Sequence, residues 1–171
     1  MKRYWPVPRS YFRRVPKNGE PGSFRINDYY MKLKKWHTGI DLAAPPGSPV
    51  LAIEDCRVVK IGQFTGAPDV PWYRKTWFVQ VENASGNVAV YGEVRKPRFA
   101  PGRAFRAGER LGSIAIVEWA RNARPRGRSM LHFELYKPGT KNFVDWWHKG
   151  KPWPKNLLDP TRYLESCLSK K

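Results

Sequence analysis

The stretch that decides the fold reads HTGIDLAAPPGSPVLA and occupies residues 37–52. It sets an imidazole, His37, four residues before a carboxylate, Asp41. Gly39 lies between them and allows a tight turn, so both side chains can point at one ion. The run that follows, residues 49–53, is apolar and rich in β-branched side chains, which is typical of a strand.

Further short apolar runs predict more strands, separated by turns and loops. We expect these strands at residues 57–61, 76–81, 88–91, 113–117 and 130–136. Residues 84–87 supply the turn of a hairpin, whereas residues 62–75 and the basic segment 119–128 are predicted loops.

A short helix is predicted near the end of the chain. Asp159 is expected to cap it and Pro160 to be its first residue, and the helix should run through Leu164 and Leu168. The predicted fold class is therefore mainly β: an antiparallel sheet or open barrel with long loops and a short C-terminal helix.

The length of 171 residues suits one compact domain. Residues 1–30 are rich in Arg, Pro and Tyr without a clean period, so we interpret them as a basic arm or a loop packed on a domain formed by residues 31–171. The two cysteines, Cys56 and Cys167, lie far apart, which leaves open two reduced thiols or a single bridge.

The charge of the chain indicates an anionic partner. Lys and Arg total 32 against 14 acidic residues, a formal net charge of +18. Candidate partners are bacterial peptidoglycan or another anionic polymer, a virion or other large assembly, and nucleic acid. The last is least favoured, because no zinc-finger, RRM or helix-turn-helix pattern occurs.

The apolar runs and the N-terminal residues indicate where the protein acts. No run approaches the roughly 20 apolar residues that span a bilayer, and the N-terminal residues lack the apolar core of a secretory signal. We therefore expect no membrane span, and a protein that is cytoplasmic until released, or carried in a phage particle, and that acts at the bacterial cell wall.

Histidines are scarce, which narrows the search for a metal site to His37, His132 and His148. His37, Asp41 and His132 would give three nitrogen and oxygen ligands and leave a fourth position for water, as catalytic zinc requires. Zinc would then lower the pKa of that water and polarise a carbonyl. Spacing alone leaves a second reading open, in which the His–Asp pair is a coincidence and His132 is a core residue.

Residues 37–52 also resemble the opening motif of the lysostaphin-type endopeptidases, zinc enzymes that cut peptidoglycan cross-bridges. Residues 108–112 resemble that family's turn before a core strand, residues 131–134 the second half of its His-x-His signature, and residues 159–164 its closing Asp-Pro segment. The resemblance covers about residues 24–165. It implies an antiparallel sheet with a groove, zinc on the groove floor, and His37, Asp41 and His132 as the ligands.

Two positions depart from that family, and both concern histidines near the zinc. The first position of the His-x-His motif holds Met130, and the histidine of a Tyr-x-His segment is replaced by Glu93. In one interpretation Glu93 is the general base and Tyr91, or an arginine, stabilises the oxyanion. In the other, Glu93 ligates zinc or caps a loop, and the chain is a catalytically inactive binding or structural module in a larger assembly.

Other residues receive two interpretations each. Glu134 either orients a ligand histidine or is merely the outward residue of its strand. Trp146 and Trp147 either bind substrate as part of a stacking wall or pack against the core. His148 is a surface histidine or a proton shuttle. The predicted function is a zinc metalloendopeptidase that hydrolyses the peptide cross-links of peptidoglycan.

Overall fold

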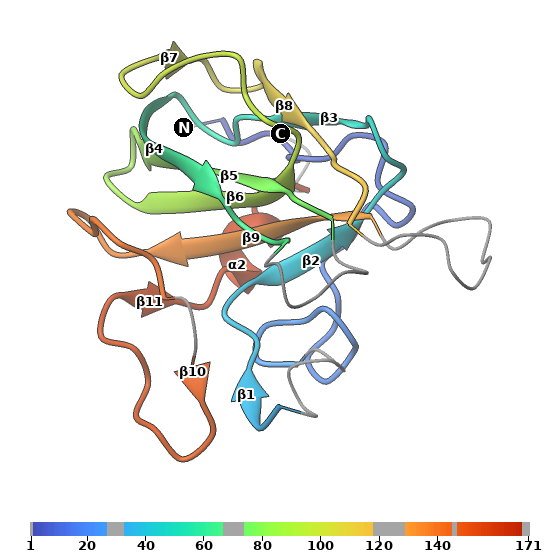
Figure 1. The fold of residues 1–171 in the computed structure, drawn as a ribbon, viewed down its shortest axis with the longest axis vertical. Coiled ribbons are helices and arrows are strands. Elements are labelled where there is room, and N and C mark those ends of the chain that lie inside the picture. The colour runs from blue at the N-terminus through green and yellow to red at the C-terminus, as the bar shows by residue number, and fades with distance from the viewer. Residues whose placement is uncertain (1, 27–32, 67–73, 118–128, 145–146, 169–171) are drawn as a thin grey trace.

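The computed structural model describes residues 2–26, 33–66, 74–117, 129–144 and 147–168, and shows an antiparallel β domain (Figure 1). Its main sheet has seven strands in the order β11-β9-β6-β5-β4-β7, with β2 also paired to β9. The long strands are β4 (Cys56–Gln63), β5 (Trp77–Asn83), β6 (Val88–Val94) and β9 (Met130–Tyr136). The short ones are β2 (Ile40–Ala43), β7 (Ala104–Phe105) and β11 (Leu157–Leu158).

Two small sheets flank the main one. In the first, β1 (Lys35–Trp36) pairs with β10 (Trp147–His148), and in the second, β3 (Pro49–Leu51) pairs with β8 (Arg110–Ser113). The mainly β, antiparallel class predicted from the sequence is therefore confirmed. Within the described ranges, no helix has the length and apolar character needed to cross a bilayer.

The register of the central strands separates two faces of the main sheet. Tyr91 lies opposite Phe133, and Gly92 lies opposite His132. Since side chains alternate along a strand and opposite residues share a face, His132 lies on one face and Phe133 on the other. The Phe133 ring stacks on Tyr163 of helix α2 (Thr161–Glu165) at 6.0 Å between centroids, so this helix covers the Phe133 face.

Several predicted elements have different bounds in the structure, and two of them differ most in position or capping. The strand expected at 113–117 is instead β8, Arg110–Ser113, because its pairing partner β3 meets it there; Ile114 forms only an isolated bridge to Val94. The helix begins at Thr161 and ends at Glu165, earlier than predicted, and Pro160 rather than Asp159 is its capping residue. The basic segment 119–128 lies outside the described residues.

The N-terminal segment, residues 2–26, contains no strand or helix but packs into the domain. Trp5, Val7, Val15 and Phe24 are buried in the hydrophobic core. Its backbone also bonds to that of later residues: the amide of Asp41, for example, donates to the carbonyl of Gly22 at 2.8 Å. Residues 2–26 are therefore packed against the rest of the domain.

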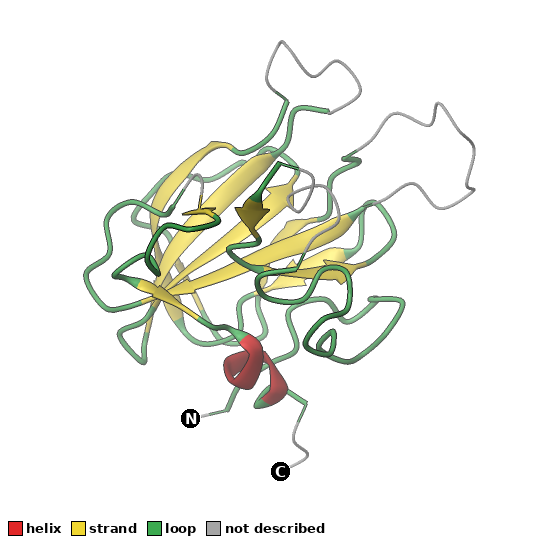
Figure 2. Cartoon of the chain, turned by 90° about the horizontal axis from the view of Figure 1, so that it is seen from below, coloured by secondary structure: helices red, strands yellow, loops and turns green. Residues whose placement is uncertain are grey.

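Arg3 connects the N-terminal segment to Glu54 through an ion pair and to Ser166, just after α2 (Figure 2), through a hydrogen bond. Arg3 donates from Nε to Glu54 Oε1 at 2.7 Å and from Nη1 to Ser166 Oγ at 3.1 Å. The side chain of Glu54 is fully buried. Burial raises the pKa of Glu54, but the hydrogen bonds from Arg3 and Ser85 outweigh it and hold that pKa below its usual value.

We expect Arg3→Ala to lower the free energy of unfolding at pH 7 by about 1–3 kcal/mol, since it leaves a buried carboxylate short of a donor. A carboxyl whose pKa is depressed in the folded state stabilises the protein above its unfolded pKa, and this contribution is lost as the pH falls through the folded value. The difference between wild type and variant should therefore shrink below about pH 4.

Urea unfolding between pH 3 and pH 8 measures this difference. The control is Arg103→Ala, which removes an exposed pair to Glu109 at 3.6 Å and should cost about 0.5 kcal/mol or less. Equal losses for the two variants, or a loss that does not depend on pH, would contradict the role given to Arg3.

Candidate metal centre

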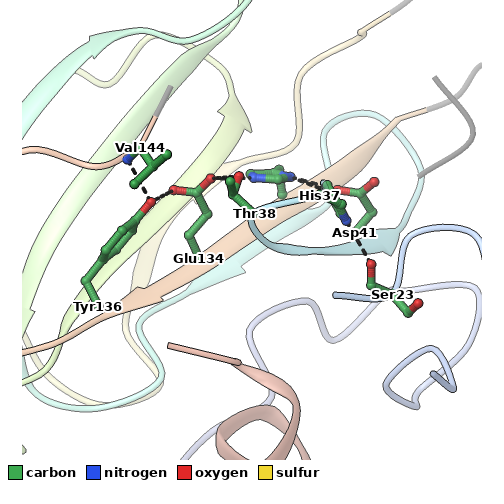
Figure 3. A network of polar contacts seen from close by, with 8 residues as sticks. Ser23, His37, Thr38, Asp41, Glu134, Tyr136 and Val144 are labelled. Atoms are coloured by element: carbon green, nitrogen blue, oxygen red, sulfur yellow. Dashed lines mark hydrogen bonds and ion pairs between the residues drawn. The ribbon is translucent and has the colours of Figure 1, made fainter. Parts of the chain in front are cut away.

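Three potential ligand atoms converge where β2 meets β9 (Figure 3). His37 Nε2, Asp41 Oδ1 and His132 Nδ1 all lie within 4.8 Å of one another. The two nitrogens are 3.1 Å apart, and Asp41 Oδ1 is 2.9 Å from the His132 nitrogen and 3.2 Å from that of His37. Asp41 and His132 are register partners on adjacent strands, which explains how residues 91 positions apart meet.

In each imidazole, the hydrogen bond of the nitrogen that faces away from the cluster indicates that the nitrogen facing into the cluster is an acceptor. Nδ1 of His37 faces the carbonyl of Ser23 at 2.9 Å, and Nε2 of His132 faces Glu134 Oε1 at 3.0 Å. Both partners can only accept, so these nitrogens carry the ring protons. In the neutral rings, the two inward nitrogens therefore present lone pairs to each other and to the Asp41 carboxylate. Such a buried set of acceptors is stabilised by positive charge between them, either a proton on His132 Nδ1 that is donated to Asp41 at 2.9 Å or a metal ion.

The charge balance of the site supports the same conclusion. Burial lowers the pKa of His132, but hydrogen bonds to Asp41 and Glu134 outweigh it and raise that pKa to about 10. Burial raises the pKa of Asp41, yet the facing imidazoles of His37 and His132 hold it well below its usual range. The carboxylates are thus ionised, and the pocket favours positive charge.

Gly39 has a different role from the one predicted. Its backbone lies outside the left-handed region that favours glycine. Instead, a Cβ at this position would lie 2.8 Å from Nε2 of His132 and 2.6 Å from the carbonyl of Phe133. The glycine is therefore required because the His132 ring packs directly against the backbone of residue 39.

Glu134 connects His132 to a longer hydrogen-bond chain, which Figure 3 follows along the sheet. Its Oε1 also accepts from the hydroxyl of Thr38, and its Oε2 accepts from that of Tyr136 at 2.6 Å. The Tyr136 oxygen in turn accepts from the amide of Val144 at 3.0 Å. Glu134 thus has the contacts of a residue that fixes the tautomer and orientation of a ligand histidine.

We expect Glu134→Gln to weaken zinc binding about 10–100-fold, because loss of such a carboxylate has that effect in other zinc sites. The amide keeps the shape of the side chain but removes the charge that favours the Nε2–H tautomer. Competition with a chromogenic zinc chelator measures the affinity. Glu82→Gln, an exposed change on β5, should leave it unaltered; equal zinc affinities for both variants would contradict the positioning role.

Glu93 lies at a bulge of β6, one residue after Gly92, which is the register partner of His132. Two residues of β6, Gly92 and Glu93, oppose the single residue Phe78 of β5, because the register passes from Tyr91–Val79 to Val94–Trp77. Glu93 is buried and has a φ of 61°, a left-handed conformation that is uncommon outside glycine. Bulges of this kind re-aim side chains and recur next to active sites.

Two further residues complete the surroundings of His132. Met130 is half-buried on β9, two residues before His132, and therefore on the same face of the strand. Phe64 packs on His132 with ring centroids 5.3 Å apart. A Cβ at Gly92 would lie 2.7 Å from the Phe64 ring, so this glycine allows the ring to reach over the imidazole.

The structure does not bring Tyr91 to the metal centre. Its ring is fully buried on the Phe133 face, at 5.3 Å from the Phe133 ring, and its hydroxyl accepts from the amide of Ile53 at 3.1 Å. Alternation along β6 sends its side chain away from the face of His132. The predicted role of Tyr91 at the oxyanion is therefore not carried further.

The predicted aromatic wall also differs from expectation. Trp147 is buried, and its ring packs on those of Trp36 at 6.0 Å and Trp153 at 5.1 Å, so it belongs to the core and is not open to a substrate. Trp146 lies outside the described residues. His148 is exposed on β10.

Several residues around the site were missed by sequence reasoning. Thr38 and Tyr136 hold Glu134, and Phe64 covers His132. Tyr136 could have been found from the strand period, since it shares a face with His132 and Glu134; Phe64 carries no such signal. A hollow of about 290 Å³ also adjoins Asp41. It is lined by Phe12, Arg14, Pro16, Glu20, Pro21 and residues 41–43.

Comparison with known proteins identifies the family. The fold and the His–Asp–His cluster define a β domain with a candidate metal site, and the family model of peptidase family M23 matches residues 35–145. The chain belongs to peptidase family M23. No curated protein sequence matches it.

Solved structures show the same fold. The catalytic domain of the antimicrobial peptidase lysostaphin from Staphylococcus simulans is 17% identical, with a TM-score of 0.52 over 96% of this chain and 90% of that one. LytU is 19% identical, with a TM-score of 0.56 over 91% and 88%. A mutant catalytic domain of the prophage-encoded M23 protein EnpA from Enterococcus faecalis is 22% identical, with a TM-score of 0.50 over 88% and 98%. The chain spans 57% of the length of a longer lysostaphin structure.

Proposed function

We propose that this protein is a zinc metalloendopeptidase that hydrolyses peptide cross-links of bacterial peptidoglycan. One observation carries the proposal: two imidazole nitrogens and one carboxylate oxygen converge within 4.8 Å of one another in a buried site that favours positive charge. Two nitrogens and one oxygen match the ligand preference of zinc and leave one tetrahedral position open. The hydrogen bonds on the far side of both imidazoles suit ligation through the inward nitrogens.

In this proposal, different residues bind the metal and transfer the proton. His37, Asp41 and His132 would hold zinc, which supplies a Lewis acid that polarises the scissile carbonyl and eases deprotonation of water. Glu93 would accept the proton of the attacking water and pass it to the leaving amine. Its bulged, left-handed backbone next to Gly92, the register partner of His132, supports this role.

Membership of family M23 and the net charge both support the proposed substrate and site of action. A net charge of +18 would concentrate the protein on the anionic bacterial wall. The hollow that Asp41 lines adjoins one of the three proposed ligands and would give a peptide room to approach the metal from that side. Release by lysis or carriage in a phage particle would bring the protein to the wall.

Metal analysis and a wall-hydrolysis assay test the proposal together. We expect about one zinc per chain. Purified walls from a panel of species should release new amino termini, and a chelator should stop the release until zinc is restored. If the protein holds zinc but releases no amino termini from any wall, the enzyme proposal fails, and the chain is a binding or structural module.

A further inference from the structure

A second hollow lies between the N-terminal segment and α2, on the other side of Ser23 from the metal ligands. Its volume is about 540 Å³, within the usual range for pockets that bind small ligands. We propose that it binds the amino-sugar units of the peptidoglycan glycan strand. The inference rests on the proposed function for its choice of polymer, but none of the three metal ligands lines the hollow.

Trp153 provides a rigid aromatic face in this hollow. The residue is 44% exposed, in contrast to the buried Trp147. The indole is held in place because Nε1 donates to the carbonyl of Leu157 at 2.7 Å and because the rings of Phe24 and Trp147 pack on it at 5.3 and 5.1 Å. A sugar ring can stack on such a flat apolar surface with little loss of side-chain entropy.

The charges around the hollow favour a neutral ligand over a polyanion. Two cations, Arg25 and Arg162, are balanced by two carboxylates, Asp159 and Glu165. This balance is unusual in a chain whose basic residues outnumber its acidic ones 32 to 14. A polyphosphate would be repelled by the carboxylates, whereas the hydroxyl and acetamido groups of an amino sugar can both donate to them and accept from the arginines.

Ser23 ties the hollow to the metal centre. Its carbonyl accepts from His37 Nδ1, while its hydroxyl points away from His37 (Figure 3). The residue lines the hollow and is 2% exposed, and its hydroxyl has no hydrogen-bond partner among the described residues. Such a buried polar atom is uncommon and suits a ligand's hydroxyl. A glycan in the hollow would thus lie close to the centre where its attached peptide is cut.

Calorimetric titration of the full chain with an N-acetylglucosamine tetramer tests the proposal. No peptide is present in this probe, so binding does not depend on hydrolysis. We expect Trp153→Ala and Arg162→Ala each to raise the dissociation constant about tenfold, the effect of losing one good contact. Arg162 is exposed, so its removal keeps the fold even if Trp153→Ala destabilises it. Trp77→Ala, which removes a half-buried tryptophan of β5, is the matched control.

Each outcome decides between glycan binding and its alternatives. No binding of the tetramer, or equal binding by wild type and Arg162→Ala, overturns the inference. So does a salt-sensitive preference for poly(glycerol phosphate) that Arg162→Ala abolishes, since it would make the hollow a polyanion site. Glycan binding without wall hydrolysis supports the inference while the proposed function fails, and hydrolysis without glycan binding does the reverse.

Discussion

His132→Ala should abolish stoichiometric zinc binding and all detectable wall hydrolysis. Four-ligand structural zinc sites are worth about 10–16 kcal/mol, or about 2.5–4 kcal/mol for each ligand. Losing one ligand therefore weakens zinc binding by roughly a hundredfold to a thousandfold. The substitution also leaves two carboxylates, those of Asp41 and Glu134, without the imidazole that lies 2.9 and 3.0 Å from them.

Zinc content after dialysis and the rate of amino-terminus release measure the two effects. The matched control is His148→Ala, which removes an exposed histidine on β10 and should keep one zinc per chain and full activity. Loss of zinc in both variants would point to a non-specific effect of removing histidines. If His132→Ala retained its zinc, the three-ligand site would be rejected.

The strands that define this fold were predictable where period and turn chemistry agree. Strand β9 has the predicted bounds, and the hairpin between β5 and β6 turns at the predicted residues with Gly86 at a φ of 85°. The prediction failed where the bounds of a strand depend on the strand with which it pairs. The bounds of β8 depend on its pairing with the three residues of β3, and the sequence around Ser113 carries no trace of that pairing.

The candidate site was likewise predictable only in part. The sequence indicated His37, Asp41 and His132 because histidine is rare in this chain and these residues lie in recognisable motifs. The structure brings the three side chains together. Tyr91, by contrast, was assigned a role from its neighbours in sequence, whereas alternation along β6 turns it toward the opposite face. Contacts such as that of Phe64 with His132 join distant parts of the chain, which no local pattern reveals.

Glu93→Gln is the decisive test of catalysis, since it should retain zinc but lose about 10²–10⁴-fold in rate, the usual contribution of a general base. The amide is nearly isosteric with the carboxylate and cannot accept a proton at neutral pH. The backbone of residue 93 adds a physical reason to expect a function there. A non-glycine residue with a φ of 61° costs about 1–3 kcal/mol, and such strain clusters at active sites.

The left-handed backbone of Glu93 also allows a test that distinguishes a chemical role of its side chain from a structural one. Glycine is relaxed at positive φ, so Glu93→Gly relieves the backbone strain even though it removes the side chain. If Glu93 only shapes the bulge, Glu93→Gly should hydrolyse walls at the wild-type rate. If Glu93 is the base, Glu93→Gly should be as inactive as Glu93→Gln, and Glu93→His should recover activity, because an imidazole can also accept the proton. Full activity in Glu93→Gln would assign proton transfer to another group.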